Sequence, residues 1–136
     1  MTSDVHVIRA GAAAVVDRNR GVRTTHLVTT AQGATSFVNG ITELEAGASL
    51  PFHFHNCDES VVVLQGVAAF EVEGQTHELG PDDATLVPAG VAHRFANPGS
   101  GSLRLFFTYG SAQPTRTMAD SGETVAIGSP RDRLDP

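Results

Sequence analysis

The stretch that decides the fold reads GASLPFHFHNCDESVVVLQG and covers residues 47–66. His53 and His55 are two positions apart, so on a β-strand both imidazoles point to the same face. Two imidazoles on one face form half of a metal site. Glu59 follows four residues after His55. A short turn between them would bring the Glu59 carboxylate to the same ion as a third ligand.

A second stretch, PAGVAHRFAN at residues 88–97, offers the fourth ligand. Pro88 and Gly90 form a turn signal that leads into a strand carrying His93. Three neutral imidazoles and one carboxylate suit a divalent transition metal, and poorly suit Ca²⁺, which prefers six or more oxygen ligands. We therefore expect one ion per chain, with Fe, Mn, Co, Ni, Cu and Zn all open as its identity.

Short β-like runs separated by turn residues surround these two stretches. The runs are rich in Val, Ile, Thr and Phe, and many alternate with period two. Such evenly spaced runs predict an antiparallel sandwich or small barrel. A ninth strand is expected at residues 124–127, a possible helix at residues 9–17, and a flexible tail at residues 129–136. The eight principal runs are 22–28, 36–44, 59–64, 67–73, 75–79, 84–87, 92–96 and 103–109.

The two stretches together fit a pair of spaced motifs. The first reads G-x5-H-x-H-x3-E-x6-G over residues 47–66, and the second reads P-x-G-x2-H-x3-N over residues 88–97. This pair resembles the two signature motifs of the cupin superfamily, and the resemblance covers residues 40–109. One departure is Asp82, which stands where the second motif usually opens with Gly, although Gly80 lies two positions earlier.

The resemblance implies an all-β fold, a cupin jelly-roll barrel of six to eight antiparallel strands in one domain. Residues 1–35 would form an N-terminal arm with short strands, 36–110 the barrel, and 111–136 a C-terminal strand and flexible tail. It also implies that His53, His55, Glu59 and His93 hold the metal inside the barrel. Glu59 would additionally serve as a catalytic base, a role known in some cupins.

Strand alternation nominates residues for the cavity wall. Phe95 follows His93 by two positions and shares its inward face. Val61, Val63 and Phe37 complete an apolar wall that suits an aromatic or other apolar-bodied substrate. Register alone leaves open whether Arg104 faces inward, where it would indicate an anionic substrate, or outward as a solvated charge. The same choice stays open for Asn39 and Glu43.

Several other residues favour structural roles. Cys57, between His55 and Glu59, is interpreted as a loop residue leaning away from the barrel, in preference to a thiolate beside the metal. Gly66 and Gly90 supply positive φ in turns, and Asn97 ties down its own loop. Three histidines lack motif partners and are expected at the surface or on edges: His6, His26 and His77.

Composition limits the function classes. The 136 residues and 14.2 kDa allow one domain, and a net charge of −6 argues against nucleic-acid binding. The lone cysteine excludes an intrachain disulfide. The first residues lack the basic and apolar regions of a signal peptide, and no apolar run approaches a membrane span. A cytoplasmic protein without a membrane partner is therefore expected.

The leading functional hypothesis is an O₂-dependent dioxygenase whose small-molecule substrate binds the metal as an anion. The alternatives are a non-redox metal-dependent cyclase, isomerase or lyase, and a cupin that binds a ligand without turnover. Phe52 and Phe54 point away from the lumen if the histidines point into it. Because two such exposed aromatics form a costly apolar patch, and because cupins are commonly dimers, a homodimer is expected.

Overall fold

Short strands account for nearly all of the regular structure. The structure, a computed structural model, describes residues 4–136, and within them twelve β-strands accompany two three-residue 3₁₀ helices, η1 (Ala10–Ala12) and η2 (Thr30–Gln32). The strands are β1 (Val15–Asp17), β2 (Val22–His26), β3 (Val38–Leu44), β4 (His53–His55), β5 (Glu59–Gln65), β6 (Ala68–Val72), β7 (Gln75–Leu79), β8 (Ala84–Val87), β9 (His93–Ala96), β10 (Leu103–Tyr109), β11 (Thr115–Met118) and β12 (Thr124–Ala126).

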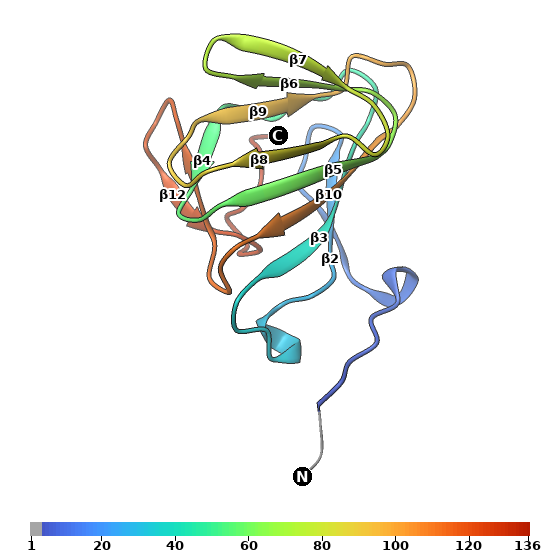
Figure 1. The fold of residues 1–136 in the computed structure, drawn as a ribbon, viewed down its shortest axis with the longest axis vertical. Helices are drawn as coiled ribbons and strands as arrows, with labels where there is room; N and C mark the ends of the chain where they lie inside the picture. The colour runs from blue at the N-terminus through green and yellow to red at the C-terminus, as the bar shows by residue number, and fades with distance from the viewer. Residues whose placement is uncertain (1–3) are drawn as a thin grey trace.

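The strands form two six-stranded antiparallel sheets that lie as two layers of a barrel (Figure 1). The first sheet runs in the order β1-β2-β3-β10-β5-β8, and the second in the order β12-β11-β4-β9-β6-β7. Some strands that are neighbours in a sheet are distant in sequence, such as β3 and β10. Such pairs require the long connections that are typical of a jelly roll. The expected all-β jelly-roll fold is confirmed.

Period-two alternation places the core between the two sheets. Along β10, Leu103, Leu105, Phe107 and Tyr109 are buried, whereas the residues between them are only half-buried. Strand β3, the neighbour of β10 in the same sheet, alternates in the same way, with its even-numbered residues inward. Because the inward residues of both layers are largely apolar, their burial supplies the main driving force for closing the barrel.

Two turn positions show how the motif residues act in the fold. Gly66 has φ +88°, and a Cβ there would lie 2.7 Å from the carbonyl oxygen of Ser102, so only glycine fits. Asn97 donates from Nδ2 to the carbonyl oxygens of Leu44 (2.9 Å) and Gly101 (2.8 Å), which ties down its own loop.

The ends of the chain differ from the sequence expectations. The possible helix at residues 9–17 is instead the single turn η1 followed by strand β1, which pairs with β2. Strand β11 was not foreseen, and it pairs with both β4 and β12. The expected flexible tail includes Asp132 and Leu134, both buried. No helix among residues 4–136 has the length and apolarity needed to cross a lipid bilayer.

Candidate metal centre

The register of β4 and β9 brings the two sequence motifs together. His53 and His93 are direct cross-strand partners on these antiparallel strands. His55 lies on the same face of β4 as His53, while Phe54 points to the other face, and both histidines are buried. The backbone N–H of Gly90 donates to the carbonyl of His55 at 2.9 Å, so the turn before β9 is bonded to the end of β4.

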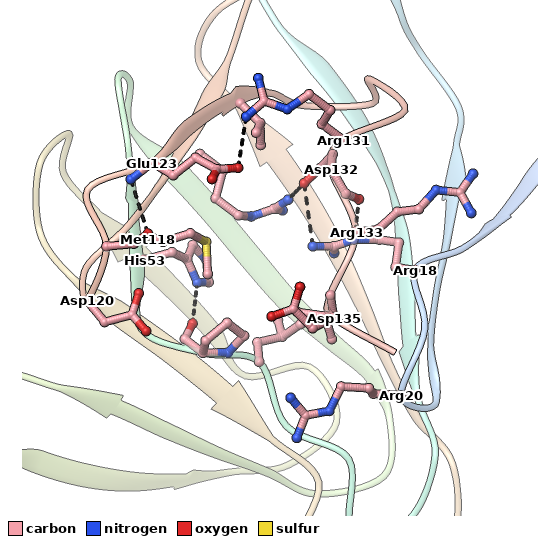
Figure 2. A pocket seen from close by; sticks show the side chains of 16 residues that line it. Arg18, Arg20, His53, Met118, Asp120, Glu123, Arg131, Asp132, Arg133 and Asp135 are labelled. Carbon is pink, nitrogen blue, oxygen red and sulfur yellow. Dashed lines mark hydrogen bonds and ion pairs between the residues drawn. The ribbon is translucent and has the colours of Figure 1, made fainter.

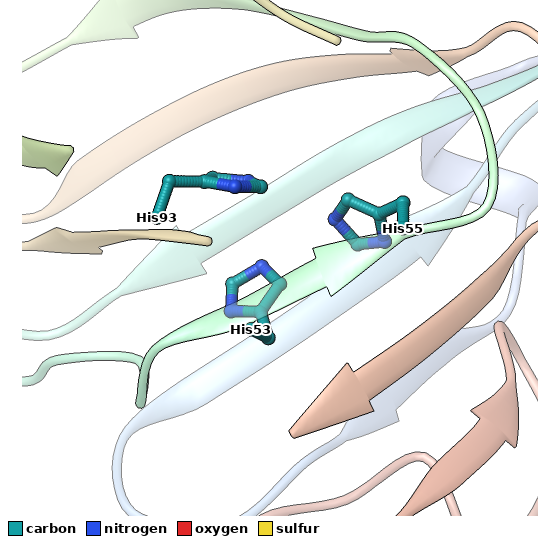
Figure 3. Close-up of side chains that lie close together, drawn as sticks. All are labelled: His53, His55 and His93. Atoms are coloured by element: carbon teal, nitrogen blue, oxygen red, sulfur yellow. The ribbon is translucent and has the colours of Figure 1, made fainter. Parts of the chain in front are cut away.

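The three imidazoles converge on one point inside the barrel (Figure 3). One ring nitrogen from each of His53, His55 and His93 lies within 4.8 Å of the others. Nitrogens around one tetrahedral ion, with Zn–N distances of about 2.0–2.1 Å, lie about 3.4 Å apart, so a small adjustment of these side chains would let the three rings share one ion. The cluster therefore has the donor spacing of a metal site.

Each imidazole is oriented by its outer nitrogen. Nδ1 of His53 lies 2.7 Å from the carbonyl oxygen of Pro51, Nδ1 of His55 2.9 Å from that of Thr115, and Nδ1 of His93 2.9 Å from that of Val91. A carbonyl oxygen only accepts, so Nδ1 carries the proton in each ring. In the neutral rings Nε2 is then unprotonated, which is the form that binds a metal.

The imidazoles of His53 and His55, both on β4, are in the neutral form that binds a metal at neutral pH. Burial lowers the pKa of His53 well below its ordinary value, and the nearby positive charge of Arg116 acts in the same direction. Burial also lowers the pKa of His55 to about 4, despite the opposing influence of Glu59. Both rings are therefore neutral at pH 7 and available as ligands.

Glu59 lies against the imidazole cluster. Its Oε1 is 2.9 Å from Nε2 of His93, and its Oε2 is 3.6 Å from Nε2 of His55. Burial alone would raise the pKa of this carboxyl, but the contacts with His93 and His55 outweigh burial and the pKa lies below its ordinary value. Because Nδ1 of His93 carries its proton, Nε2 of a neutral His93 ring is an acceptor, as is the Glu59 carboxylate. Two acceptors 2.9 Å apart need a proton or a cation between them.

The donor set fits a divalent transition metal. Nε2 of His55 is buried and has no hydrogen-bond partner among residues 4–136, as expected for an atom whose partner is an ion. His53, His55 and His93 would supply three nitrogens to the ion, and the Glu59 carboxylate, which contacts His93 and His55, stays the candidate for a fourth ligand.

The lining of the inner cavity includes some of the nominated residues. A small cavity of about 30 Å³ is bordered by His53, Glu59, Val61 and Phe95. Val63 is buried in the core but does not border this cavity, since it lies one inward position farther along β5. The expectation for Phe37 is wrong: it is 45% exposed, because it precedes β3 in the odd-numbered register that points outward.

The open questions of register are answered on the outer face of the first sheet. Arg104 points outward and its Nε donates to Glu43 at 3.0 Å, so it does not face the lumen. Asn39 also lies on the outer side of β3. Cys57 is buried in the hydrophobic core and does not lean out of the barrel. Burial raises the pKa of its thiol, and its sulfur is not part of the cluster formed by His53, His55 and His93.

Other singled-out residues take ordinary positions. His6 and His77 are exposed, and His26 is half-buried with its ring 6.2 Å from that of Phe107. Gly90 has φ +82°, and Asp82 has φ +74°. Asp82 therefore adopts the left-handed conformation that glycine would supply at this motif position.

Sequence reasoning missed two charged residues beside the site. Arg18 and Arg116 both border the inner cavity, and both also border a larger cavity of about 380 Å³ outside it (Figure 2). Arg18 follows the three-residue strand β1, and Arg116 lies on the unforeseen strand β11. Arg116 is the one buried residue of β11, whose burial does not alternate, so residues 115–118 offered no clear sequence signal.

Two relatives from Streptomyces align with most of this chain. Protein SchB of Streptomyces halstedii is 33% identical over 112 residues, which are 79% of this chain and 81% of SchB. The tetracenomycin polyketide synthase protein TcmJ of Streptomyces glaucescens is 30% identical over 108 residues, which are 79% of this chain and 72% of TcmJ.

A solved structure shows the same fold over nearly the whole chain. The polyketide cyclase RemF from Streptomyces resistomycificus is 22% identical, with a TM-score of 0.71 over 97% of this chain and 89% of RemF. Residues 40–109, about half of this chain, match the family model described as the cupin domain. Together with the identity to SchB, this match shows that the chain belongs to the cupin family.

Proposed function

We propose that this protein is a metal-dependent, non-redox cyclase that acts on a polyketide intermediate. The observation that carries the proposal is the convergence of three buried imidazoles with Nδ1 bonded to carbonyls and Nε2 turned to a common point beside Glu59. A divalent metal bound there supplies Lewis acidity. The names of two relatives support a polyketide substrate, since TcmJ is a polyketide synthase protein and RemF a polyketide cyclase.

The O₂-dependent dioxygenase gains no support from these relatives. The name of TcmJ refers to a polyketide synthase and that of RemF to a polyketide cyclase, and neither refers to oxygen chemistry. A cyclisation needs a base, a polarised carbonyl and exclusion of water, and does not change the oxidation state of the substrate. The non-redox alternative therefore replaces the dioxygenase as the main hypothesis.

Glu59 is proposed to move the proton in the cyclisation. Its pKa lies below the ordinary value, so the carboxylate is ionised at neutral pH and can accept a proton on Oε1 or Oε2. The proton comes from a methylene between two carbonyls of the substrate, and the resulting carbanion attacks another carbonyl carbon of the same chain. One C–C bond forms, and the proton returns from Glu59 to the new alkoxide oxygen.

Apolar residues exclude water from this step. Val61, Phe95 and Leu105 border the inner cavity. Tyr109 adds a hydroxyl that stays protonated, because burial and the nearby Glu59 raise its pKa. A dry wall favours carbanion chemistry because water would otherwise protonate the reacting carbon.

The test supplies the protein with linear poly-β-ketone chains made by a minimal polyketide synthase. The metal-loaded protein is expected to redirect the products toward one cyclised compound, equally with and without O₂, as measured by liquid chromatography and mass spectrometry. An unchanged product profile contradicts the cyclase. Product formation that consumes O₂ would restore the dioxygenase.

We also propose that the functional unit is a homodimer. Phe52 is 38% exposed beside β4 and carries the guanidinium of Arg94 at 4.6 Å from its ring centroid. Phe54 is only half-buried on the same outer face. A partner subunit would cover both rings.

A further inference from the structure

Two cavities beside the candidate metal centre share part of their lining, and this shared part is called the wall here. The inner cavity, about 30 Å³, borders His53 and Glu59, and the outer cavity, about 380 Å³, lies among β11, β12 and the last residues of the chain. Four residues border both: Arg18, Leu50, His53 and Arg116. The inner cavity has room for about one water molecule, so a larger substrate has to pass this wall to reach Glu59.

The wall is closed by a buried ion cluster. Arg18 Nε donates to the carbonyl oxygen of Asp132 at 3.2 Å, and Arg18 Nη2 lies 3.6 Å from Asp132 Oδ1. Arg116 Nη1 donates to the same Oδ1. All three side chains are buried: Arg18 is 5% exposed, Arg116 7% and Asp132 6%. One carboxylate thus sits on two guanidinium groups inside the protein.

The cluster carries more positive charge than negative. Two arginines face one carboxylate, and Glu59 is committed to His93 and His55. Tyr109, 3.4 Å from Arg116 Nη2, adds no negative charge because its raised pKa keeps it protonated. Arg116 Nε is buried without a hydrogen-bond partner among residues 4–136. Burying an uncompensated cation is costly, so the wall favours an incoming anion.

We propose that Arg18 and Arg116 form a substrate-binding site for a carboxylate, and that Asp132 occupies this site and closes the barrel until an anionic substrate displaces it. The Asp132 carboxylate indicates that the expected ligand is also a carboxylate, because the two guanidinium groups already bind one and their planar geometry matches it. This inference rests on the proposed function and specifies its substrate as an acyl chain with a free carboxylate, such as a β-keto acid.

The segment that carries Asp132 is attached in a way that allows it to open. Beyond the ion cluster, the backbone N–H of Leu134 donates to the carbonyl of Arg18 at 2.8 Å, and Asn19 Nδ2 donates to the carbonyl of Leu134 at 2.7 Å. Asp132 Oδ2 accepts from the N–H of Gly128 at 3.0 Å. Two exposed bonds complete the attachment: Arg133 Nη1 donates to the carbonyl of Asp17 at 3.0 Å, and Arg131 Nη2 donates to Glu123 at 2.9 Å. Because exposed bonds compete with water, loss of the buried carboxylate contact should expose the Leu134 amide to solvent.

The first experiment measures binding of 3-oxooctanoate and of its uncharged methyl ester to Zn²⁺-loaded protein by calorimetry. Asp132→Asn removes the internal competitor and keeps its shape. It should bind the acid about tenfold more tightly than wild type, the scale of one charge-assisted hydrogen bond, and the ester no more tightly. The matched control is Asp135→Asn, an exposed carboxylate bordering the outer cavity, which should leave both affinities unchanged. An Asp132→Asn variant that binds the acid no better than Asp135→Asn overturns the proposal.

A second measurement uses the wild-type protein, so it decides the matter if Asp132→Asn does not fold. Hydrogen exchange at the Leu134 amide should rise at least several-fold at 10 mM 3-oxooctanoate and stay constant with the ester. If adding the acid leaves exchange at the Leu134 amide unchanged, whether or not calorimetry shows that the acid binds, the displacement of Asp132 is refuted. Both readouts are independent of turnover: a working cyclase without acid–ester discrimination keeps the proposed function and rejects this site.

Discussion

His53 and His93 lie directly opposite each other on the antiparallel strands β4 and β9, with ring centroids 4.7 Å apart. This one cross-strand pair joins the two sequence motifs at the barrel lumen. Because side chains alternate with period two, a slip of one residue would turn His93 to the other face of the sheet. The metal centre therefore depends on sheet register as much as on the identity of its ligands.

Metal content is the first expected outcome of this arrangement. Protein purified without an affinity tag should contain close to one transition-metal ion per chain by mass spectrometry of the metal. His53→Ala or His93→Ala should weaken binding by more than about 100-fold, since losing even an outer partner of a ligand costs about 10–100-fold. His77→Ala, an exposed histidine on β7, is the control and should keep the metal. Wild-type protein unable to take up Fe, Mn, Co, Ni, Cu or Zn would contradict the assignment.

Much of the barrel could be predicted because its signals are local. The alternation of residues 103–109 matches the buried and half-buried pattern of β10. The spacing of His53, His55 and His93 within short strands and turns led directly to their convergence. The expectation for Phe37 is wrong because alternation divides a strand into two sets of residues without indicating which set faces inward, and in β3 it is the even-numbered set.

The arginine cluster could not be predicted because its contacts are distant in sequence. Arg18 and Asp132 are near opposite ends of the chain, and only the packing of the last residues against β1 and β11 brings them together. The polar composition of residues 129–136 resembles that of a solvated tail. Its buried members, Asp132 and Leu134, are single residues without a periodic pattern.

Acid should destabilise the metal-free protein. The pKa of His55 is lowered from 6.5 to about 4, and the pKa of His53 is lowered as well, so the unfolded chain binds more protons than the folded chain below pH 6.5. Stability is complete above pH 6.5 and is lost as pH falls through about 4. His55 alone should account for about 3 kcal/mol of this loss. Urea unfolding between pH 7 and pH 4 measures it, and a His55→Gln variant with an undiminished slope would refute this origin.

Asp82 offers a test of backbone strain at the altered motif position. Its φ of +74° is unfavourable for a residue with a Cβ, and glycine removes that cost. Glycine also loses more chain entropy on folding, so Asp82→Gly should stabilise the protein by only about 0.5 kcal/mol. Asp83→Gly is the matched control, and it should destabilise, because Asp83 Oδ2 accepts from the N–H of Gly80 at 2.9 Å. Urea midpoints that fall equally in both variants would show that φ at Asp82 is not strained.

The proposed dimer places Phe52 and Phe54 in the subunit interface. Light scattering at micromolar concentration should give twice the chain mass, and Phe52→Glu should shift it to the monomer, because a buried unpaired carboxylate is costly. Leu86→Glu is the control: Leu86 is 72% exposed on the other sheet, and its replacement should leave the dimer intact. A wild-type monomer, or a dimer lost only in Leu86→Glu, would place the interface elsewhere or remove it.

Glu59 distinguishes a structural ligand from a working base. Glu59→Gln keeps the shape of the side chain and removes the charge that lies 2.9 Å from His93 Nε2. It should weaken metal binding less than His53→Ala does, because the three imidazoles remain. It should nevertheless lower the rate of cyclised product formation by about 10²–10⁴-fold, the usual contribution of a general base. Glu71→Gln, whose carboxylate pairs with Arg94 at 3.0 Å away from the cluster, should keep wild-type turnover. If Glu59→Gln also turns over at the wild-type rate with metal bound, Glu59 only balances charge, and the proton must move through another group.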